Sequence, residues 1–321
     1  MYSKIYTDFM KFRIYIHLTY IELAKLWVFH LIKKDTLFRI LEVKMCSKES
    51  VKLENFKFFV FAMAEYGRAD ILKMLMEIET KLKLEFPLRK TMFNYEMKIN
   101  NDETLLHVAA ISGHINVAKL LISSGIDPNV SNLMLETPLH YAAKNNQMEM
   151  LDFLIENGAK ETIDYIMQTP LMYGILNSYG GVCDLTSLKH MITKFPNNLQ
   201  VALTLAIDLG DFPSFATIIN EGEGHYDINY FYEYEELTLL HKVSSHGFSD
   251  FVKLLLEKGA DLDCRSKSGE TPLYLAAWHG QVEVVKLLLE AGADKISINL
   301  SGTPYSVAYR KGYYEICELL K

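Results

Sequence analysis

The stretch that decides the fold occupies residues 269–292 and reads GETPLYLAAWHGQVEVVKLLLEAG. We interpret it as two short helices packed antiparallel. Pro272 suits a first helical turn, because the N–H that proline lacks has no intrahelical partner there. Gly280 breaks the first helix, and Gly292 follows the second, where helices commonly end in a left-handed residue. Four apolar residues of the second helix recur at the steps typical of one buried face: Val282, Val285, Leu288 and Leu289.

Two helices of this length cannot bury such faces alone, so the interpretation requires neighbouring copies. Copies are present in the sequence. A threonine marks the same position in six of them: Thr104, Thr137, Thr169, Thr238, Thr271 and Thr303. The successive spacings are 33, 32, 69, 33 and 32 residues, and the spacing of 69 spans one further, degenerate unit.

This period, with Thr-Pro-Leu-His, a pair of alanines, a glycine and Leu-Leu-x-x-Gly-Ala-Asp, resembles the ankyrin repeat. The resemblance is close over residues 102–321 and loose over residues 56–99. It implies an all-α solenoid of helix–turn–helix units of about 33 residues, joined by β-hairpin loops. We expect about eight units in residues 55–321. The first, fourth, fifth and last are degenerate, and residues 1–54 form a non-repeat segment.

Two segments depart from the repeat pattern. We interpret residues 1–54 as a helical cap over the first repeat, as sequence upstream of a true start at Met45 or Met63, or as a targeting segment. No signal peptide is apparent, and charged residues interrupt the apolar run 14–32, which therefore makes a poor membrane span. Residues 81–101 are too many for the usual hairpin and predict an extended loop.

The charge of the chain limits the possible partners. The net charge is −7. Residues 1–54 hold ten Lys and Arg against six Asp and Glu, a net +4, so the remainder carries −11. This acidic balance argues against a non-specific nucleic-acid binder, which needs a basic face. It suits a basic or neutral protein partner, although it also serves solubility.

No residue pattern in the sequence indicates catalysis. Cys46, Cys183, Cys264 and Cys317 show no paired spacing, which indicates reduced structural thiols. The sequence also lacks a glycine-rich phosphate loop, a His-Glu-x-x-His and a Gly-x-Ser-x-Gly motif. We therefore predict a protein without catalysis, cofactor or metal. We expect it in the cytoplasm of its own cell or, for an effector, of a host cell.

Three histidines occupy the fourth place of the Thr-x-Leu-His signature: His107, His140 and His241. The ankyrin resemblance implies that each bonds with the preceding threonine and ties the helix start to the neighbouring backbone. Such a role satisfies a polar group near the interior. We expect structural histidines rather than catalytic ones.

Binding is the function that the resemblance implies. Hairpin tips and the exposed side of the first helix line a concave groove in ankyrin arrays. Exposed aromatic and aliphatic residues at such places suit binding hot spots, unless neighbouring hairpins cover them. The predicted partner contacts are Leu133, Met134, Lys144, Tyr165, Ile166, Tyr234, Lys267, Trp278 and His279.

Residues 226–236, YDINYFYEYEE, hold five aromatic residues on a long connection. They form either a further contact surface or a patch folded back over the irregular fifth unit. We predict a monomeric, non-catalytic protein–protein interaction module or scaffold that binds a protein partner. The alternative is a host-targeted effector or adaptor of an intracellular microbe that uses residues 1–54 as a second interaction site. An enzyme or enzyme regulator ranks below both.

Overall fold

The computed structural model describes residues 40–41, 53–85, 97–180, 184–232 and 236–321. These ranges contain 16 α-helices, two 3-10 helices and no β-strand, which confirms the predicted all-α repeat fold. The predictions for residues 1–54 lie almost entirely outside them, as do those for Cys46, Cys183 and Tyr234.

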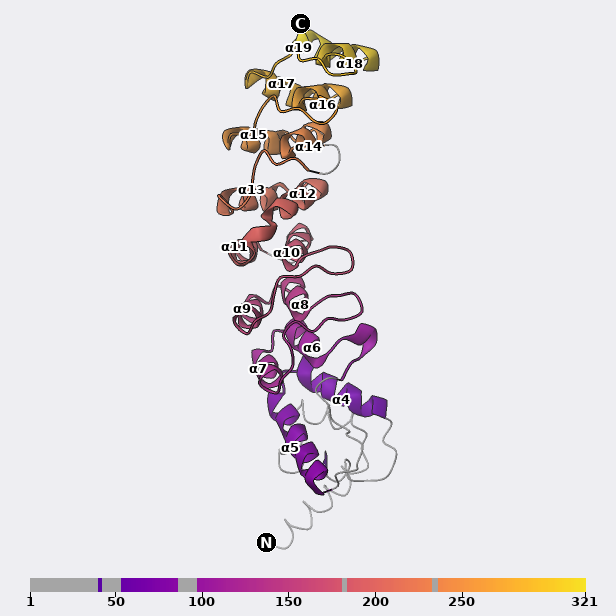
Figure 1. Cartoon of the computed structure of the whole chain (residues 1–321), viewed down its shortest axis with the longest axis vertical. Coiled ribbons are helices and arrows are strands. Elements are labelled where there is room, and N and C mark those ends of the chain that lie inside the picture. Colours follow the sequence, from indigo (N-terminus) through magenta and orange to yellow (C-terminus); the bar gives the residue numbers. More distant parts are fainter. Residues whose placement is uncertain (1–39, 42–52, 86–96, 181–183, 233–235) are drawn as a thin grey trace, which may run out of the picture. The chain divides into compact units, whose positions relative to one another are not determined.

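The helices alternate along the chain between a first and a second helix of each repeat (Figure 1). Their bounds are α4 Leu53–Glu65, α5 Ala69–Glu85, η1 Asn100–Asp102, α6 Leu105–Ser112, α7 Ile115–Ser123, α8 Pro138–Lys144, α9 Met148–Glu156, α10 Pro170–Tyr179, α11 Leu185–Lys194, η2 Pro196–Asn198, α12 Leu199–Leu209, α13 Phe212–Glu221, α14 Leu239–His246, α15 Ser249–Glu257, α16 Pro272–His279, α17 Val282–Glu290, α18 Pro304–Lys311 and α19 Tyr314–Leu320.

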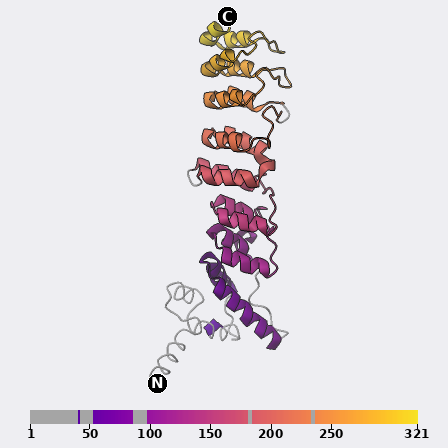
Figure 2. The same cartoon turned by 90° about the vertical axis from the view of Figure 1, so that its left-hand side faces the viewer.

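The chain divides into two compact units, residues 1–173 (unit 1) and 174–321 (unit 2). In unit 1, α6 packs between α4 and α8, and α7 packs between α5 and α9. In unit 2, the first helices α14, α16 and α18 form one row, and the second helices α13, α15, α17 and α19 form another. Figure 2 shows these helix pairs of unit 2 as successive parallel layers.

Local chemistry sets the ends of the helices. Thr271 caps α16 by accepting the N–H of Tyr274 at 3.2 Å, and Pro272 occupies the first helical turn. Gly280 then ends the helix in the left-handed conformation, with φ of 75°, as predicted. A side chain at Gly280 would also meet the ring of Tyr313, so both backbone and space favour glycine there.

The core lies between the two rows of helices. The paired alanines, such as Ala276 and Ala277, are fully buried, which lets the helices approach closely. The buried face of α17 differs from the prediction. Val284 is fully buried in it, whereas Val282 and Leu289 are only half-buried.

The predicted extended loop at residues 81–101 is wrong at its start, because α5 continues to Glu85. The residues that extend the helix, KLKLE, are all good helix formers. Phe86 precedes Pro87, and a residue before proline disfavours the helical conformation. Residues 86–96 lie outside the described ranges.

The fourth repeat is irregular, as predicted. It has Gly174 where other repeats carry alanine, and a Cβ atom there would lie 2.2 Å from the methyl carbon of Met191. The glycine therefore makes room for α11 against α10. In the fifth repeat Pro213 lies in the first turn of α13, where proline is tolerated.

Cys264 and Cys317 are buried free thiols, as expected of core residues. The described helices include none with the length and hydrophobicity needed to cross a membrane.

Candidate protein-interaction surface

Three buried histidines join helix starts to the next repeat. His107 Nδ1 accepts the N–H of Thr104 at 3.1 Å and lies 2.9 Å from its hydroxyl, while Nε2 donates to the carbonyl of Glu136 at 3.0 Å. His140 and His241 make the same set of bonds in their own repeats. This geometry requires a neutral ring protonated on Nε2. It confirms the predicted structural role.

Burial lowers the pKa of all three imidazoles below 6.5, although the bonds to the neighbouring carbonyls oppose this effect. The rings therefore stay neutral near neutral pH, in the form that the repeat-to-repeat bonds require.

The two hairpin tips of unit 1 expose a cluster of apolar side chains, which we call the unit 1 tip surface. Each of its side chains is between 43% and 69% exposed. Four of its residues were predicted from the sequence, and two more join them. Its members are Leu133, Met134, Leu135, Tyr165, Ile166 and Met167.

Two members of this surface adopt a backbone conformation that favours glycine. The φ angles are 58° at Leu135 and 65° at Met167. The corresponding place in other repeats holds Asp102 and Glu236, with φ of 63° and 53°, and Gly269, with φ of 77°. For a residue with a side chain this left-handed conformation costs roughly 1–2 kcal/mol. Leu135 and Met167 therefore keep apolar side chains exposed at a cost that glycine would avoid.

Buried polar side chains hold the two tips in shape. Asn132 Oδ1 accepts two backbone N–H groups of its own tip, at 2.9 and 3.0 Å. Asp164 Oδ1 accepts two in the next tip, at 2.9 and 2.8 Å. The Tyr165 N–H donates to the Met134 carbonyl at 2.8 Å, which joins one tip to the other. The tips are thus fixed from beneath and from the side.

A cluster of carboxylates and tyrosines lies under the unit 1 tip surface. The Tyr141 hydroxyl lies 2.6 Å from a Glu103 oxygen and 3.1 Å from Glu136. The Tyr173 hydroxyl lies 2.7 Å from Asp164 and 3.1 Å from Glu136. Burial and these carboxylates raise the pKa of both tyrosines far above its ordinary value, so both hydroxyls remain donors.

Lys144, a predicted contact residue, closes this cluster at its exposed rim. Its Nζ lies 3.6 Å from Glu136 and 5.2 Å from the centre of the Tyr173 ring. Burial raises the pKa of Glu136, but the bonds from Asn132 and Tyr141 and the charge of Lys144 outweigh it, so the pKa lies below 4.5. Glu136 is therefore a carboxylate at neutral pH. The ammonium group of Lys144 partly balances the negative charge of Glu136.

Three predicted contacts of unit 2 that the structure describes are exposed on different elements. Trp278 and His279 end α16, and Lys267 lies at a hairpin tip. The Nζ of Lys311 lies 4.4 Å from the centre of the Trp278 ring, a cation–π contact between neighbouring repeats. Tyr309, which the sequence did not single out, is 61% exposed on α18.

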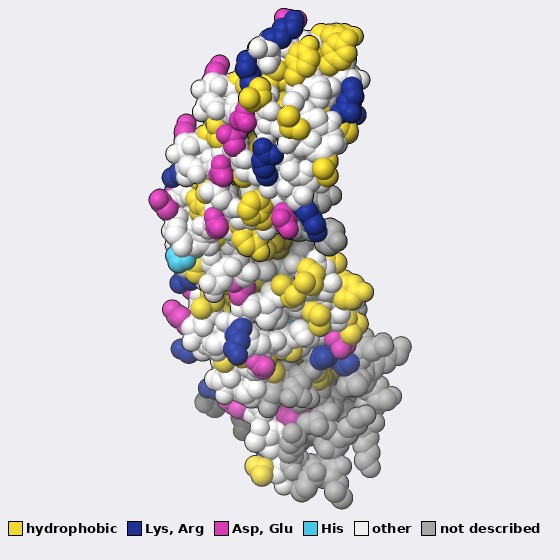
Figure 3. Space-filling model, turned by 45° about the horizontal axis from the view of Figure 1, so that its top comes forward, with side chains coloured by type: hydrophobic (Ala, Val, Ile, Leu, Met, Phe, Trp, Pro, Cys, Tyr) yellow, Lys and Arg dark blue, Asp and Glu magenta, His cyan; other side chains and the backbone are white. Residues whose placement is uncertain are grey.

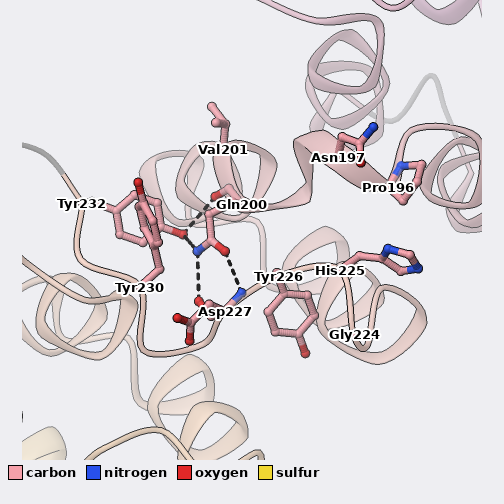
Figure 4. A pocket seen from close by; sticks show the side chains of 10 residues that line it. All are labelled: Pro196, Asn197, Gln200, Val201, Gly224, His225, Tyr226, Asp227, Tyr230 and Tyr232. Atoms are coloured by element: carbon pink, nitrogen blue, oxygen red, sulfur yellow. Dashed lines mark hydrogen bonds between the residues drawn. The ribbon is translucent and has the colours of Figure 1, made fainter.

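Residues 226–232 of the aromatic segment fold back over α12 (Figure 4). Gln200 Oε1 accepts the Asp227 N–H at 2.8 Å, and Gln200 Nε2 donates to the Asp227 carbonyl at 3.1 Å. The Tyr232 hydroxyl donates to the Gln200 carbonyl at 3.0 Å and also contacts its amide. The Tyr226 hydroxyl donates to the Ile219 carbonyl at 2.7 Å. This side of the segment supports the fold.

The other side of the segment faces solvent. Tyr230 and Phe231 are about half exposed. Beside them an open hollow of about 720 Å³ lies between the segment and the start of α12, with Pro196, Val201 and His225 among its lining residues. The interpretation as a patch over the fifth unit therefore holds for Tyr226 and Tyr232, and a contact surface at Tyr230 and Phe231 stays a prediction. Residues 233–235 lie outside the described ranges.

In the part of the chain that the structure describes, His, Cys, Asp and Glu form no group of three that could hold a metal ion. The histidines join backbone groups of neighbouring repeats, and the cluster around Glu136 joins side chains to one another; both are hydrogen-bonded supports. The exposed apolar tips and the aromatic end of α16 are candidate binding surfaces.

Comparison with known protein families gives the same fold. Models of ankyrin repeats match residues 106–155 and 203–299. An ankyrin repeat protein of fowlpox virus, FPV223, is 32% identical over 145 residues, which cover 99% of that protein and 44% of this chain. The chain belongs to the ankyrin-repeat family, whose repeats are protein–protein interaction modules.

Other relatives are much longer than this chain. Ankyrin repeat protein nuc-2 of Neurospora crassa is 31% identical over 182 residues, 55% of this chain and 17% of nuc-2. The palmitoyltransferase ZDHHC17 of Danio rerio is 26% identical over 208 residues, 54% of this chain and 28% of the enzyme. The similarity thus covers only a part of each of these two relatives.

Proposed function

We propose that the chain recognises a protein partner through the unit 1 tip surface and the exposed side of its first helices. One observation carries this proposal: Leu135 and Met167 expose apolar side chains in a conformation that favours glycine. Unfavourable backbone conformations tend to occur where function requires a particular side chain. Six exposed apolar residues on two adjacent tips provide the central anchors that protein interfaces need.

The mechanism is the display of a preformed surface. Asn132, Asp164 and the cluster around Glu136 fix the tips before a partner arrives, so little conformational entropy is lost on binding. We place the repeat array at residues 55–321. The proposed contacts are the nine predicted from the sequence, Leu133, Met134, Lys144, Tyr165, Ile166, Tyr234, Lys267, Trp278 and His279, with Leu135 and Met167 added.

The test compares two double variants in affinity capture from an extract of the native cell, followed by mass spectrometry. Leu133→Ser with Tyr165→Ser removes one aliphatic and one aromatic anchor from the tips. Leu185→Ser with Tyr314→Ser removes the same pair of side-chain types from second helices, where both residues are also exposed. We expect the tip variant to lose the partner by tenfold or more, about 1.4 kcal/mol or more, and the control variant to retain it.

Equal capture by both variants would contradict the proposal. A partner that is lost instead on truncation to Met45 would favour the alternative, an adaptor that uses residues 1–54. Leu135→Gly adds an independent readout. We expect it to leave the free energy of unfolding unchanged or to raise it by up to ~1 kcal/mol, while it weakens capture. If the surface did not bind the partner, Leu135→Gly would leave capture unchanged, whatever its effect on the free energy of unfolding.

A further inference from the structure

From α13 onward, charge in unit 2 is distributed by helix row; before it, the first helix α12 holds Asp208, and the second helix α11 holds Lys189 and Lys194 without Asp or Glu. The first helices α14, α16 and α18 contain three basic residues and no Asp or Glu: Lys242, Arg310 and Lys311. The second helices α13, α15, α17 and α19 contain two lysines, Lys253 and Lys286, and seven acidic residues: Glu221, Asp250, Glu257, Glu283, Glu290, Glu315 and Glu318. In Figure 3 Asp and Glu side chains line the left edge of the upper part, the side of α13, α15 and α17.

The net charge of the chain is therefore a poor guide to the face that the first helices present. Two positions recur on this face at the end of each first helix, and all their residues except the half-buried Ser245 are exposed. The first holds Ser245, Trp278 and Arg310, and the second holds His246, His279 and Lys311. Together with Tyr309, the residues at these two positions present exposed aromatic rings, basic side chains and hydrogen-bonding groups. We call Trp278, His279, Tyr309, Arg310 and Lys311 the inner surface of unit 2.

The two basic residues of this surface have no carboxylate partner within ion-pair distance among the described residues. Arg310 Nη2 donates to the Ser301 carbonyl at 2.8 Å, and Lys311 lies over the Trp278 ring. Both side chains thus keep their charge available for a ligand. Lys242, in contrast, lies 2.7 Å from Asp208 and is already paired.

The histidine is oriented by its own helix. His279 Nδ1 donates to the Leu275 carbonyl at 2.9 Å, and His246 Nδ1 makes the same bond one repeat earlier at 2.7 Å. A carbonyl can only accept, so Nδ1 carries a proton and Nε2 is left for a further partner.

We propose that the inner surface of unit 2 binds an acidic peptide segment in which Asp or Glu residues flank an aromatic or aliphatic anchor. This inference rests on the proposed function, recognition of a protein. The anchor packs on Trp278 and Tyr309, whose exposed rings provide contact area. The carboxylates pair with Arg310 and Lys311 in charge-assisted bonds. From the net charge we expected a basic or neutral partner, and for this surface we propose an acidic one instead.

The acidic second helices add specificity to this arrangement. They repel an acidic segment from the opposite side of the unit, so the first helices are its favoured place. They also disfavour a nucleic acid, whose long run of phosphates needs an extended basic path. Arg310 and Lys311, on the side away from the seven carboxylates of the second helices, suit a short acidic segment better.

The experiment selects ligands without assuming their sequence. The full chain is used to select from phage-displayed random peptides of about 12 residues, and affinities of the enriched peptides are measured by fluorescence anisotropy. We expect enrichment of Asp and Glu beside Trp, Phe or Leu. We also expect binding to weaken several-fold when the salt concentration rises from about 0.05 to about 0.3 M.

Two charge-reversal variants are then compared. Arg310→Glu with Lys311→Glu reverses the inner surface, and we expect it to weaken binding by about tenfold or more. Lys253→Glu with Lys286→Glu changes the net charge equally on second helices, and we expect less than about a twofold effect. Circular dichroism and thermal unfolding of each variant confirm that it is folded.

Several results would overturn this inference. They are enrichment of neutral or basic peptides, no enrichment at all, an equal effect of both reversals, or tighter binding of a single-stranded oligonucleotide at the same surface. Neutral peptides whose binding is lost in Trp278→Ala would overturn only the acidic preference. In that case the proposed function would stand, so failure of the two proposals is distinguishable.

Discussion

One position, three residues after the capping threonine, determines how each repeat satisfies its helix start. Histidine accepts the threonine N–H and also reaches the next repeat. Ser306 Oγ replaces the first of these bonds, at 2.9 Å from the Thr303 nitrogen, and the sulfur of Met172 does so weakly, at 3.5 Å from the Thr169 nitrogen. Tyr274 does neither, and its buried hydroxyl has no hydrogen-bond partner in the described part of the chain.

We expect Tyr274→Phe to raise the free energy of unfolding by roughly 1 kcal/mol, because it removes a buried hydroxyl that has lost water without gaining a partner. Tyr141→Phe is the matched control. Its hydroxyl lies between two carboxylates, so its loss should lower the free energy of unfolding by about 1–3 kcal/mol. Urea unfolding of both variants provides the measurement. A clear destabilisation by Tyr274→Phe would show that this hydroxyl is hydrogen-bonded after all.

At the scale of the helix and the loop, the sequence predicts what is encoded locally. Pro272 and Gly280 lie where predicted, because capping and helix ending depend on a few adjacent residues. Four of the six tip residues were also predicted, since the repeat period fixes their register, whereas Leu135 and Met167 were missed. The cluster beneath them was missed. Tyr141 and Glu103 are 38 residues apart, and no local sequence pattern predicts that their side chains are in contact.

Gln200 has a comparable supporting role at the scale of the element, because its side-chain amide holds residues 226–232 on α12. We expect Gln200→Leu to release this segment, with the Asp227 amide exchanging hydrogen for deuterium at least about tenfold faster. Val201→Ala, at the exposed neighbouring position, is the control and should leave exchange unchanged. Unaltered protection of Asp227 in the Gln200 variant would show that packing alone holds the segment.

At the scale of the whole molecule, the neutral histidines couple stability to pH. Burial lowers the pKa of His107, His140 and His241 in the folded state, so the unfolded state binds more protons below about pH 6.5. The contribution of these histidines to the free energy of unfolding is therefore fully present above about pH 6.5, and it is lost as the pH falls through their folded-state pKa values. Glu136, whose pKa is also lowered, adds a loss of the same sign at more acidic pH.

We expect the urea midpoint to fall steadily between pH 7.5 and pH 5.5, with a total loss of free energy on the order of 1 kcal/mol or more. A His140→Gln variant should be less stable at pH 7.5 and less dependent on pH. A midpoint that is flat or rises on acidification would show that the histidines are not held neutral by the fold.

The bond from the Tyr165 N–H to the Met134 carbonyl fixes the distance between the two tips of unit 1, and so the spacing at which a bound chain can contact them. Each tip has two arms, and hydrogen-bonded chains lie about 4.8 Å apart, so one tip follows the next by roughly 10 Å. An extended chain advances about 3.3 Å per residue. A partner strand laid along the tips therefore meets them with every third side chain. The contact residues of its sequence would recur with a period of three, because the spacing of the repeats determines which side chains meet a tip.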